Sequence, residues 1–203
     1  MKLESIEETR QGKLRLHFAD GSSMSVFPAV IAQLGLYSGA ELSDDAMQEL
    51  HDASGAASAK QRAVRIVAAT AVSKNELKHR LVQKGESEEH ASRAVSWLNE
   101  LNLLDDGQLA QQVVRRGASK GYGAARIRQM LYEKRVPREY WDDALAQLPE
   151  QDETIDQFLR QRFREETPDR ADIKRATDAL LRRGHSWEDI RRALGRYTKG
   201  MSL

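Results

Sequence analysis

The 203-residue sequence has no cysteine, only four prolines and few aromatic side chains, which make up 6% of its residues. The absence of cysteine excludes disulfide bonds, a cysteine nucleophile and zinc sites with thiolate ligands. Residues 1–8 show neither the basic region nor the apolar region typical of a secretion signal, and no run approaches the roughly 18 apolar residues of a membrane-spanning helix. We therefore expect a cytoplasmic protein that does not contact a membrane.

The motifs of common enzyme and cofactor sites are also missing. Gly121 and Gly123 begin a pattern typical of dinucleotide-binding loops, but Arg126 stands where the third glycine is needed. The five histidines lack the spacing of metal ligands, and no phosphate-binding GxxxxGK[ST] loop occurs. Acidic pairs such as Asp105–Asp106 resemble nuclease carboxylates, but they fall near the first turns of expected helices, where carboxylates act as caps. We expect neither a cofactor, nor a metal, nor catalysis.

Charge is unevenly distributed along the chain. The total of 32 basic and 31 acidic residues gives a net charge of +1, but residues 1–59 carry −5 and the remainder carries +6. Eight basic residues and a single acid, Glu133, lie between residues 115 and 138. This local excess of positive charge favours a polyanionic partner.

The first 58 residues are expected to form a small β element followed by short helices. Apolar residues alternate with polar ones on both sides of a turn-forming Asp20–Gly21 pair; they are Leu14, Leu16, Phe18, Met24 and Val26. Pro28 and Gly35 are placed to begin and end a short helix, and Ser43 to cap a second one that ends near Asp52. Residues 54–58, Ser-Gly-Ala-Ala-Ser, have the composition of a linker.

Beyond this linker the sequence repeats with a period of about 50 residues. The apolar positions that repeat are Leu81, Leu131 and Leu180; Val95, Leu145 and Leu194; and Leu98, Leu148 and Tyr197. We predict a mainly α-helical protein, with an acidic N-terminal segment that contains a β-hairpin and short helices, followed by three tandem three-helix repeats in an elongated, curved arrangement. The predicted boundaries are 1–58 for the segment and 59–104, 105–149 and 150–203 for the repeats.

Capping and helix-breaking residues divide each repeat into three helices. In the first repeat, a capping box at Ser73–Glu76 opens the middle helix, which follows a helix over 60–71, and Gly85 ends it. In the third, Thr167–Pro168 opens the middle helix and Gly184 ends it. The middle helix of the second repeat follows a Gly-Tyr-Gly turn.

The basic cluster contains the candidate binding residues. On the helix predicted after Gly123, Arg126 and Arg128 lie about 100° to either side of Ile127, so both guanidinium groups reach water. Together with Lys120 and the Gly-Tyr-Gly turn, they offer a flexible backbone and donors for phosphate or acidic protein groups. The candidates are Arg115, Arg116, Lys120, Tyr122, Arg126, Arg128, Lys134 and Arg135. The alternative is that these charges serve only solubility.

Three segments of the sequence resemble the RecX family, whose members regulate the recombinase RecA. They are Arg62–Ile66, Leu103–Asp106 and, most specifically, Lys120–Leu131. The acidic hairpin segment is similar to an N-terminal extension found in some members. Two positions depart from the pattern: Ala124 replaces the usual proline, and Arg135 stands where the equivalent of Gly85 would be glycine.

The resemblance implies a non-catalytic, monomeric protein that binds in the groove of the RecA filament on single-stranded DNA. Family members lower the ATPase and strand exchange of RecA by blocking filament growth or favouring disassembly, and some bind DNA directly. This function belongs to DNA repair, homologous recombination and the SOS response.

Two other functions remain open on the sequence. Three-helix units with glycine-containing turns also resemble helix-turn-helix modules, so one alternative is a DNA-binding helical repeat protein that acts independently of RecA. An enzyme is the third hypothesis, because a sequence does not reveal a site assembled from distant residues.

Overall fold

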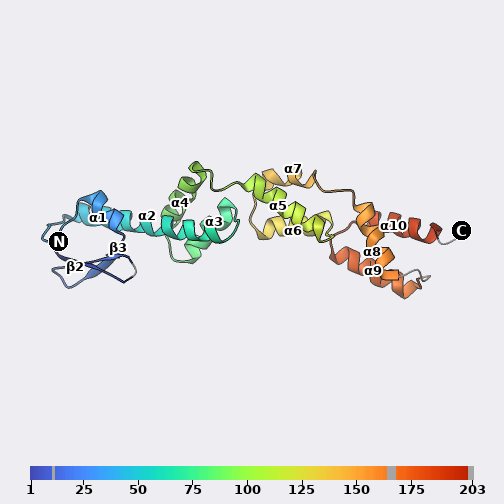
Figure 1. The fold of residues 1–203 in the computed structure, drawn as a ribbon, viewed down its shortest axis with the longest axis horizontal. Coiled ribbons are helices and arrows are strands. Elements are labelled where there is room, and N and C mark those ends of the chain that lie inside the picture. The colour runs from blue at the N-terminus through green and yellow to red at the C-terminus, as the bar shows by residue number, and fades with distance from the viewer. Residues whose placement is uncertain (11, 164–167, 201–203) are drawn as a thin grey trace. The chain divides into compact units, whose positions relative to one another are not determined.

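The structure, a computed structural model, describes residues 1–10, 12–163 and 168–200, and the side chains up to residue 197. It contains a small antiparallel sheet and a series of helices, as predicted (Figure 1). The residues form two compact units. The first comprises Met1–Ala71 and Leu77–Leu104, and the second comprises Val72–Glu76 and the chain from Asp105 onward.

The sheet of the first unit has three strands in the order β1-β2-β3: β1 (Leu3–Glu8), β2 (Leu14–Phe18) and β3 (Ser23–Val26). The predicted hairpin is confirmed, with Leu14 opposite Val26. The sequence pattern does not predict β1, because its apolar residues Leu3 and Ile6 stand three positions apart. A register shift between Leu3 and Ser5 turns both toward the same apolar core.

Two helices follow the sheet, α1 (Pro28–Leu34) and α2 (Asp44–Ala69). As predicted, Gly35 ends α1 in the left-handed conformation, and the Ser43 hydroxyl caps α2 by accepting a hydrogen bond from the N–H of Ala46.

The predicted linker at 54–58 is wrong, because α2 continues through it without a break. Its small residues reflect close packing against α4 (Glu88–Glu100): a Cβ atom on Gly55 would lie 2.3 Å from Cε1 of His90. His90 also pairs with Asp52 on α2 at 2.9 Å. The helices predicted to end near Asp52 and to span 60–71 are therefore one helix, and residue 58 lies inside it. The four predicted ranges remain a hypothesis about how the chain is divided.

The remaining helices match the predicted three-helix pattern closely. After α3 (Lys74–Gln83) and α4, the chain forms α5 (Asp106–Ser119), α6 (Ala124–Glu133), a 3-10 turn (Arg138–Tyr140), α7 (Trp141–Leu145), α8 (Gln151–Phe163), α9 (Arg170–Arg182) and α10 (Trp187–Gly200). Leu81, Leu131 and Leu180 are fully buried, as their equivalence predicts. Of the predicted start of α9, Thr167 lies outside the described residues, and the side chain of Asp169 forms a capping box with Asp172.

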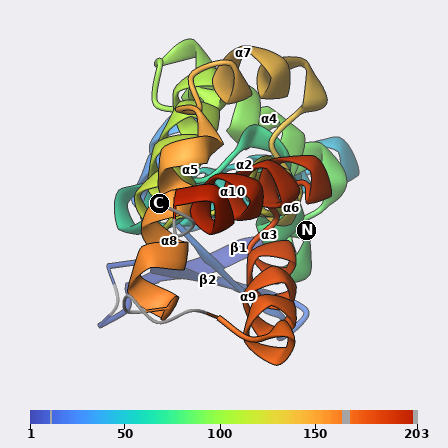
Figure 2. The same ribbon diagram turned by 90° about the vertical axis from the view of Figure 1, so that its right-hand side faces the viewer.

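Apolar side chains form separate small cores. In the first unit, one core joins the sheet to α1 and α2. In the second unit, one core joins α5, α6 and α7, and another joins α8, α9 and α10, with α10 packed against both of its neighbours (Figure 2). None of the described helices combines the length and apolar character needed to cross a bilayer.

Candidate functional site

The middle helices α3, α6 and α9 end in the same way, and this shared ending positions part of the basic cluster. Each ends with a backbone hydrogen bond to the carbonyl of a buried leucine: from Glu86 to Leu81, from Val136 to Leu131 and from His185 to Leu180, at 3.1, 3.1 and 3.2 Å. The residues before the donors have positive φ angles: Gly85 at 90°, Arg135 at 52° and Gly184 at 86°. Arg135 therefore adopts the left-handed conformation that the two glycines adopt, at a cost of roughly 1–2 kcal/mol.

In the second unit, the turn after α6 contacts the start of α3, and we call this contact the Ser73 junction. The Ser73 hydroxyl donates to the carbonyl oxygen of Lys134 at 2.7 Å and accepts from the N–H of Glu76 at 3.1 Å. The Arg135 guanidinium pairs with Glu76, with 3.1 Å between Nε and Oε2. Two candidate residues, Lys134 and Arg135, are thus positioned by this junction.

A buried carboxylate completes the Ser73 junction. Asp106, only 3% exposed, accepts a hydrogen bond from the N–H of Lys74, with 3.0 Å between nitrogen and Oδ1. Burial raises the pKa of Asp106, and the hydrogen bond from Lys74 partly opposes this effect. Asp106, the second residue of the Asp105–Asp106 pair, therefore faces this junction and not solvent.

The second unit contains an equivalent contact between the turn after α9 and the start of α6. We call this contact the Gly123 junction. The N–H groups of Gly123 and Ala125 donate to the carbonyl oxygens of Arg183 and Gly184, at 2.9 and 3.1 Å. His185 donates from Nε2 to the carbonyl oxygen of Gly121 at 3.1 Å. The expectation that this turn offers a flexible backbone to a phosphate is therefore wrong, because its polar groups bind the turn after α9.

Tyr122, within the same turn, is half-buried and packs against the core of α5–α7. Its ring therefore contributes to packing, whereas the sequence analysis assigned it to a binding surface. The signal behind that assignment, an aromatic residue between two glycines, does not distinguish a stacking platform from a core side chain.

Four of the candidate basic side chains, Arg115, Arg116, Lys120 and Arg128, are exposed and make no ion pair with any residue that the structure describes. Arg126 differs, because it is half-buried and lies 3.5 Å from Glu133 on the same helix. At 100° per residue, Arg126 and Arg128 are about 200° apart around α6. The structure therefore places them on opposite flanks of the helix.

A groove of ≈ 560 Å³ in the second unit is lined in part by residues from the end of the basic cluster at 115–138. Tyr132, 65% exposed, lines it together with Arg135, Arg138 and Trp141. The Arg138 guanidinium lies 5.7 Å from the centre of the Trp141 ring, and the indole N–H donates to the carbonyl oxygen of Val136 at 3.0 Å. Exposed aromatic rings beside arginines can stack on bases and bind phosphates.

Sequence reasoning did not single out Tyr132 or Trp141. The position of Tyr132 could have revealed it, because five residues after Ile127 it falls on the polar side of the predicted helix. A large aromatic residue on such a face, two positions before the basic pair Lys134–Arg135, is unusual for a purely structural position.

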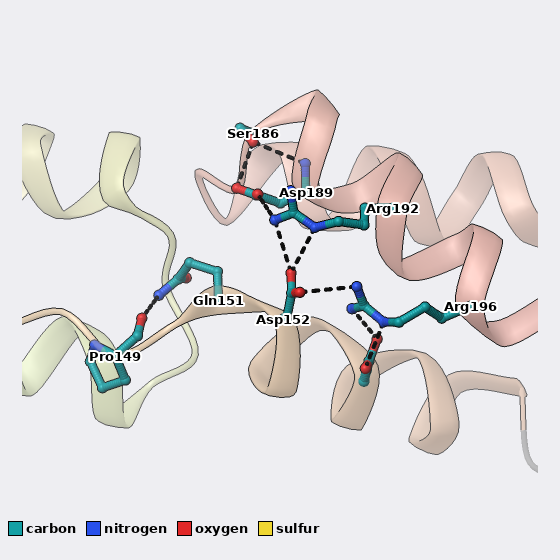
Figure 3. Close-up of polar contacts among 8 residues, drawn as sticks. Pro149, Gln151, Asp152, Ser186, Asp189, Arg192 and Arg196 are labelled. Atoms are coloured by element: carbon teal, nitrogen blue, oxygen red, sulfur yellow. Dashed lines mark hydrogen bonds and ion pairs between the residues drawn. The ribbon is translucent and has the colours of Figure 1, made fainter.

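Two basic residues of the third repeat, Arg192 and Arg196, are held in ion pairs between helices, in contrast to Arg115, Arg116, Lys120 and Arg128. On α10, Arg192 contacts Asp152 at 3.0 Å and Asp189 at 2.5 Å, and Arg196 contacts Asp152 and Asp156 at 3.0 and 2.8 Å (Figure 3). Hydrogen bonds from Arg192 are the main cause of a lowered pKa of Asp152. These arginines bind α10 to α8, so their charge is largely neutralised within the repeat.

Comparison with known proteins identifies the family. A family model described as RecX, second three-helix domain, matches residues 105–145. The regulatory protein RecX of Stenotrophomonas maltophilia is 33% identical over 135 residues, which cover 66% of this chain and 83% of that protein. The chain belongs to the RecX family. The regulatory protein RecX of Vibrio parahaemolyticus is 31% identical over 140 residues, covering 68% of this chain and 90% of the relative.

Solved structures of the family share the fold. A crystal structure of regulatory protein RecX has a TM-score of 0.72 at 24% identity and covers 96% of this chain and all of that one. The crystal structure of RecX from Lactobacillus salivarius has a TM-score of 0.62 at 19% identity, covering 70% and 96% of the two chains. The predicted membership of the RecX family is confirmed by the family model and the curated relatives, which are named as regulatory proteins.

Proposed function

We propose that this RecX-family protein binds the RecA filament on single-stranded DNA and restrains the ATPase and strand exchange of RecA. It acts without catalysis, as a monomer in the cytoplasm, in the regulation of DNA repair and recombination. The observation that carries this proposal is the unpaired positive charge of the second repeat. Arg115, Arg116, Lys120 and Arg128 pair with no carboxylate in the described part of the chain, so they are available to acidic protein groups or phosphates.

The groove lined by Tyr132 also supports the proposal that the second repeat carries the binding surface. Arg135 and Arg138 supply positive charge there, and the exposed Tyr132 ring supplies an apolar face. A single strand in the filament presents phosphates and base faces, and an acidic protein surface presents carboxylates. Both classes of group fit a surface of arginines and aromatic rings.

The test is the single-stranded-DNA-dependent ATP hydrolysis of RecA, titrated with this protein from far below to equal molar ratio. We expect inhibition well below equimolar ratio, and strong weakening of it in an Arg116→Glu/Arg128→Glu variant. An Arg160→Glu/Lys174→Glu variant is the matched control, because it makes the same charge change at exposed residues of the third repeat. Circular dichroism checks that all variants keep their helices.

Each outcome decides something. Absence of inhibition by the wild-type protein at any ratio would refute the proposal, and retained DNA binding in that case would favour a DNA-binding protein independent of RecA. Equal weakening by both double variants would show that total charge matters and the second-repeat surface does not.

A separate comparison tests the groove. Tyr132→Ala removes the exposed ring, whereas Tyr132→Phe keeps it and removes only the hydroxyl. We expect weaker inhibition from the alanine variant and near-normal inhibition from the phenylalanine variant. Loss of stacking on one base reduces affinity by roughly 1–3 kcal/mol in single-strand-binding proteins.

A further inference from the structure

A second basic site lies in the first unit. A pocket of ≈ 430 Å³ lies between α2 and the residues that precede β2 and follow β3, and it is lined by Lys13, Phe27, Ser58, Gln61, Arg62 and Arg65. Arg62 and Arg65 belong to the Arg62–Ile66 segment that resembles the RecX family, and the proposed function gives them no role. The pocket therefore needs its own explanation.

The geometry of Arg62 indicates that its guanidinium is held in place. Glu86, whose side chain is only 8% exposed, accepts hydrogen bonds from Nε of Arg62 at 2.9 Å and from the Ser58 hydroxyl at 3.0 Å. These bonds use Nε, and no described residue accepts a hydrogen bond from either Nη atom of Arg62. An immobilised guanidinium loses little conformational freedom when it binds a ligand.

The other two cations of the pocket are held more loosely. Lys13 lies with its Nζ 4.6 Å from the centre of the Phe27 ring, which favours a cation at that position. Arg65 is exposed and makes no ion pair with any described residue. Three cations and the single carboxylate of Glu86 leave the site with an excess charge of +2.

This excess is not a consequence of a generally basic surface, because the first unit, residues 1–71 and 77–104, carries 11 basic and 13 acidic residues and thus a net charge of −2. A concave site that concentrates positive charge on a unit of negative net charge selects for an anion. Two guanidinium groups, one ammonium group and the Gln61 amide match the several oxygens of a phosphate, and the volume exceeds what a lone carboxylate fills.

We propose that this pocket binds a phosphate group, either of a free nucleotide or of a nucleic-acid strand. The proposal is independent of RecA binding through the second repeat. It predicts that Lys13, Arg62 and Arg65 contact the phosphate oxygens, with Arg62 oriented by Glu86.

The test uses the full-length protein labelled with ¹⁵N and three probes at fixed ionic strength: pyrophosphate, ATP and an oligothymidylate. The readout is the change in the amide signals of Lys13, Ser58 and Arg65, which is separate from binding at the second repeat. We expect saturable changes with pyrophosphate and at least one of the other probes. In a Lys13→Gln/Arg65→Gln variant, affinity should fall about tenfold or more, because two charge-assisted contacts are removed.

The matched control is Arg15→Gln/Lys84→Gln, which removes two exposed charges of the first unit that do not line the pocket. It should bind within about twofold of the wild-type protein, since these side chains do not line the pocket and salt screens their exposed charges. Arg62 is left unchanged, because its removal would leave Glu86 buried without its cationic partner.

Saturable shifts with ATP alone among the larger probes would identify a nucleotide site, and shifts with the oligonucleotide alone would identify a strand site. No response at Lys13, Ser58 and Arg65 to any probe would overturn the proposal. Equal losses in the two double variants would also overturn it, because binding would then follow total charge.

Discussion

The Ser73 and Gly123 junctions each join the turn after one middle helix to the start of another, but different chemical groups form the hydrogen bonds. Ser73 and Gly123 each stand eight residues before an equivalent leucine, and each meets a turn whose residue with positive φ is Arg135 or Gly184. At the first junction a side-chain hydroxyl reaches the opposite carbonyl. At the second, the backbone itself comes close enough to donate. Equivalent repeats therefore conserve the geometry of a contact without conserving the groups that make it.

This difference predicts different vulnerabilities. The Gly123 junction depends on the absence of side chains, because a Cβ atom on Gly123 would lie 2.2 Å from the carbonyl oxygen of Gly184. The Ser73 junction depends on the presence of one hydroxyl. The buried titratable groups also differ, since Asp106 belongs to the first junction and His185 to the second.

The largest effect is expected from Gly184→Ala. Alanine would be strained at a φ of 86°, and its Cβ would lie 2.2 Å from the backbone nitrogen of Arg126. Strain and overpacking together should destabilise the second unit by about 3 kcal/mol or more. Urea unfolding measures the loss, and faster hydrogen exchange of the Gly123 and Ala125 amides would locate it.

The control for this variant is Gly195→Ala on α10, where a Cβ atom meets no heavy atom within 4 Å. Alanine there should stabilise the helix by roughly 0.5–1 kcal/mol. Near-normal stability of Gly184→Ala would show that the close backbone contact at the Gly123 junction is not maintained in solution.

A smaller effect is expected from Ser73→Ala. This change removes the cap of α3 and the bond to the Lys134 carbonyl, and should lower the free energy of unfolding by about 2 kcal/mol. Ser87→Ala removes a cap alone, that of α4 at the N–H of His90, and should lower it by about 1 kcal/mol. The difference between the two variants, measured by urea unfolding, isolates the junction; equal losses would contradict its contribution.

Local patterns predict most of the fold, and long-range contacts account for what they do not. Glycines and capping residues marked the helix ends correctly at Gly35, Gly85 and Gly184, because these signals act within a few residues. Within α2, Gly55 packs against His90, 35 positions away, and no local pattern distinguishes this contact from a linker. Likewise, the turn at Gly123 binds a segment some 60 residues later, and no local pattern shows that its backbone groups are already used.

The sequence predicts where the basic residues of the candidate site cluster, but it does not predict which of their side chains are exposed and unpaired. The count of basic residues between 115 and 138 identified the region, whereas pairing decided which charges are available. Arg126 has a carboxylate partner and Arg128 has none among the described residues. The partner, Glu133, was visible in the sequence, but only helical geometry brings it within reach of Arg126.

A pH change should act on the two junctions in opposite directions. Burial lowers the pKa of His185 from its usual value of 6.5, and the positive charge of Arg183 lowers it further. The hydrogen bond between His185 and Gly121 and the negative charge of Asp189 partly oppose this decrease. Stability from neutral His185 is therefore complete above pH 6.5 and is lost as the pH falls through the folded-state pKa. Asp106 has a raised pKa, so its effect has the opposite sign: stability is complete below pH 3.8 and is lost as the pH rises through the folded-state pKa.

Hydrogen exchange at pH 7.5 and 5.5 tests this contrast after correction for the intrinsic dependence of exchange on pH. We expect reduced protection of the Gly123 amide at the lower pH and unchanged or greater protection of the Lys74 amide. A His185→Gln variant, which cannot gain a proton, should lose the pH response at Gly123. Persistence of that response in the variant would assign it to another group.

The smallest effect is expected from Arg135→Gly, which gives the turn after α6 the residue found at Gly85 and Gly184. Glycine removes a conformational cost of roughly 1–2 kcal/mol, but it also loses the ion pair to the half-buried Glu76 and increases the freedom of the unfolded chain. These effects oppose each other, so stability should change by less than about 1 kcal/mol. If the arginine is present for binding, the variant should nevertheless inhibit RecA less well. A large loss of stability would instead show that the side chain of Arg135 is a structural part of the Ser73 junction, because the left-handed backbone alone would favour glycine.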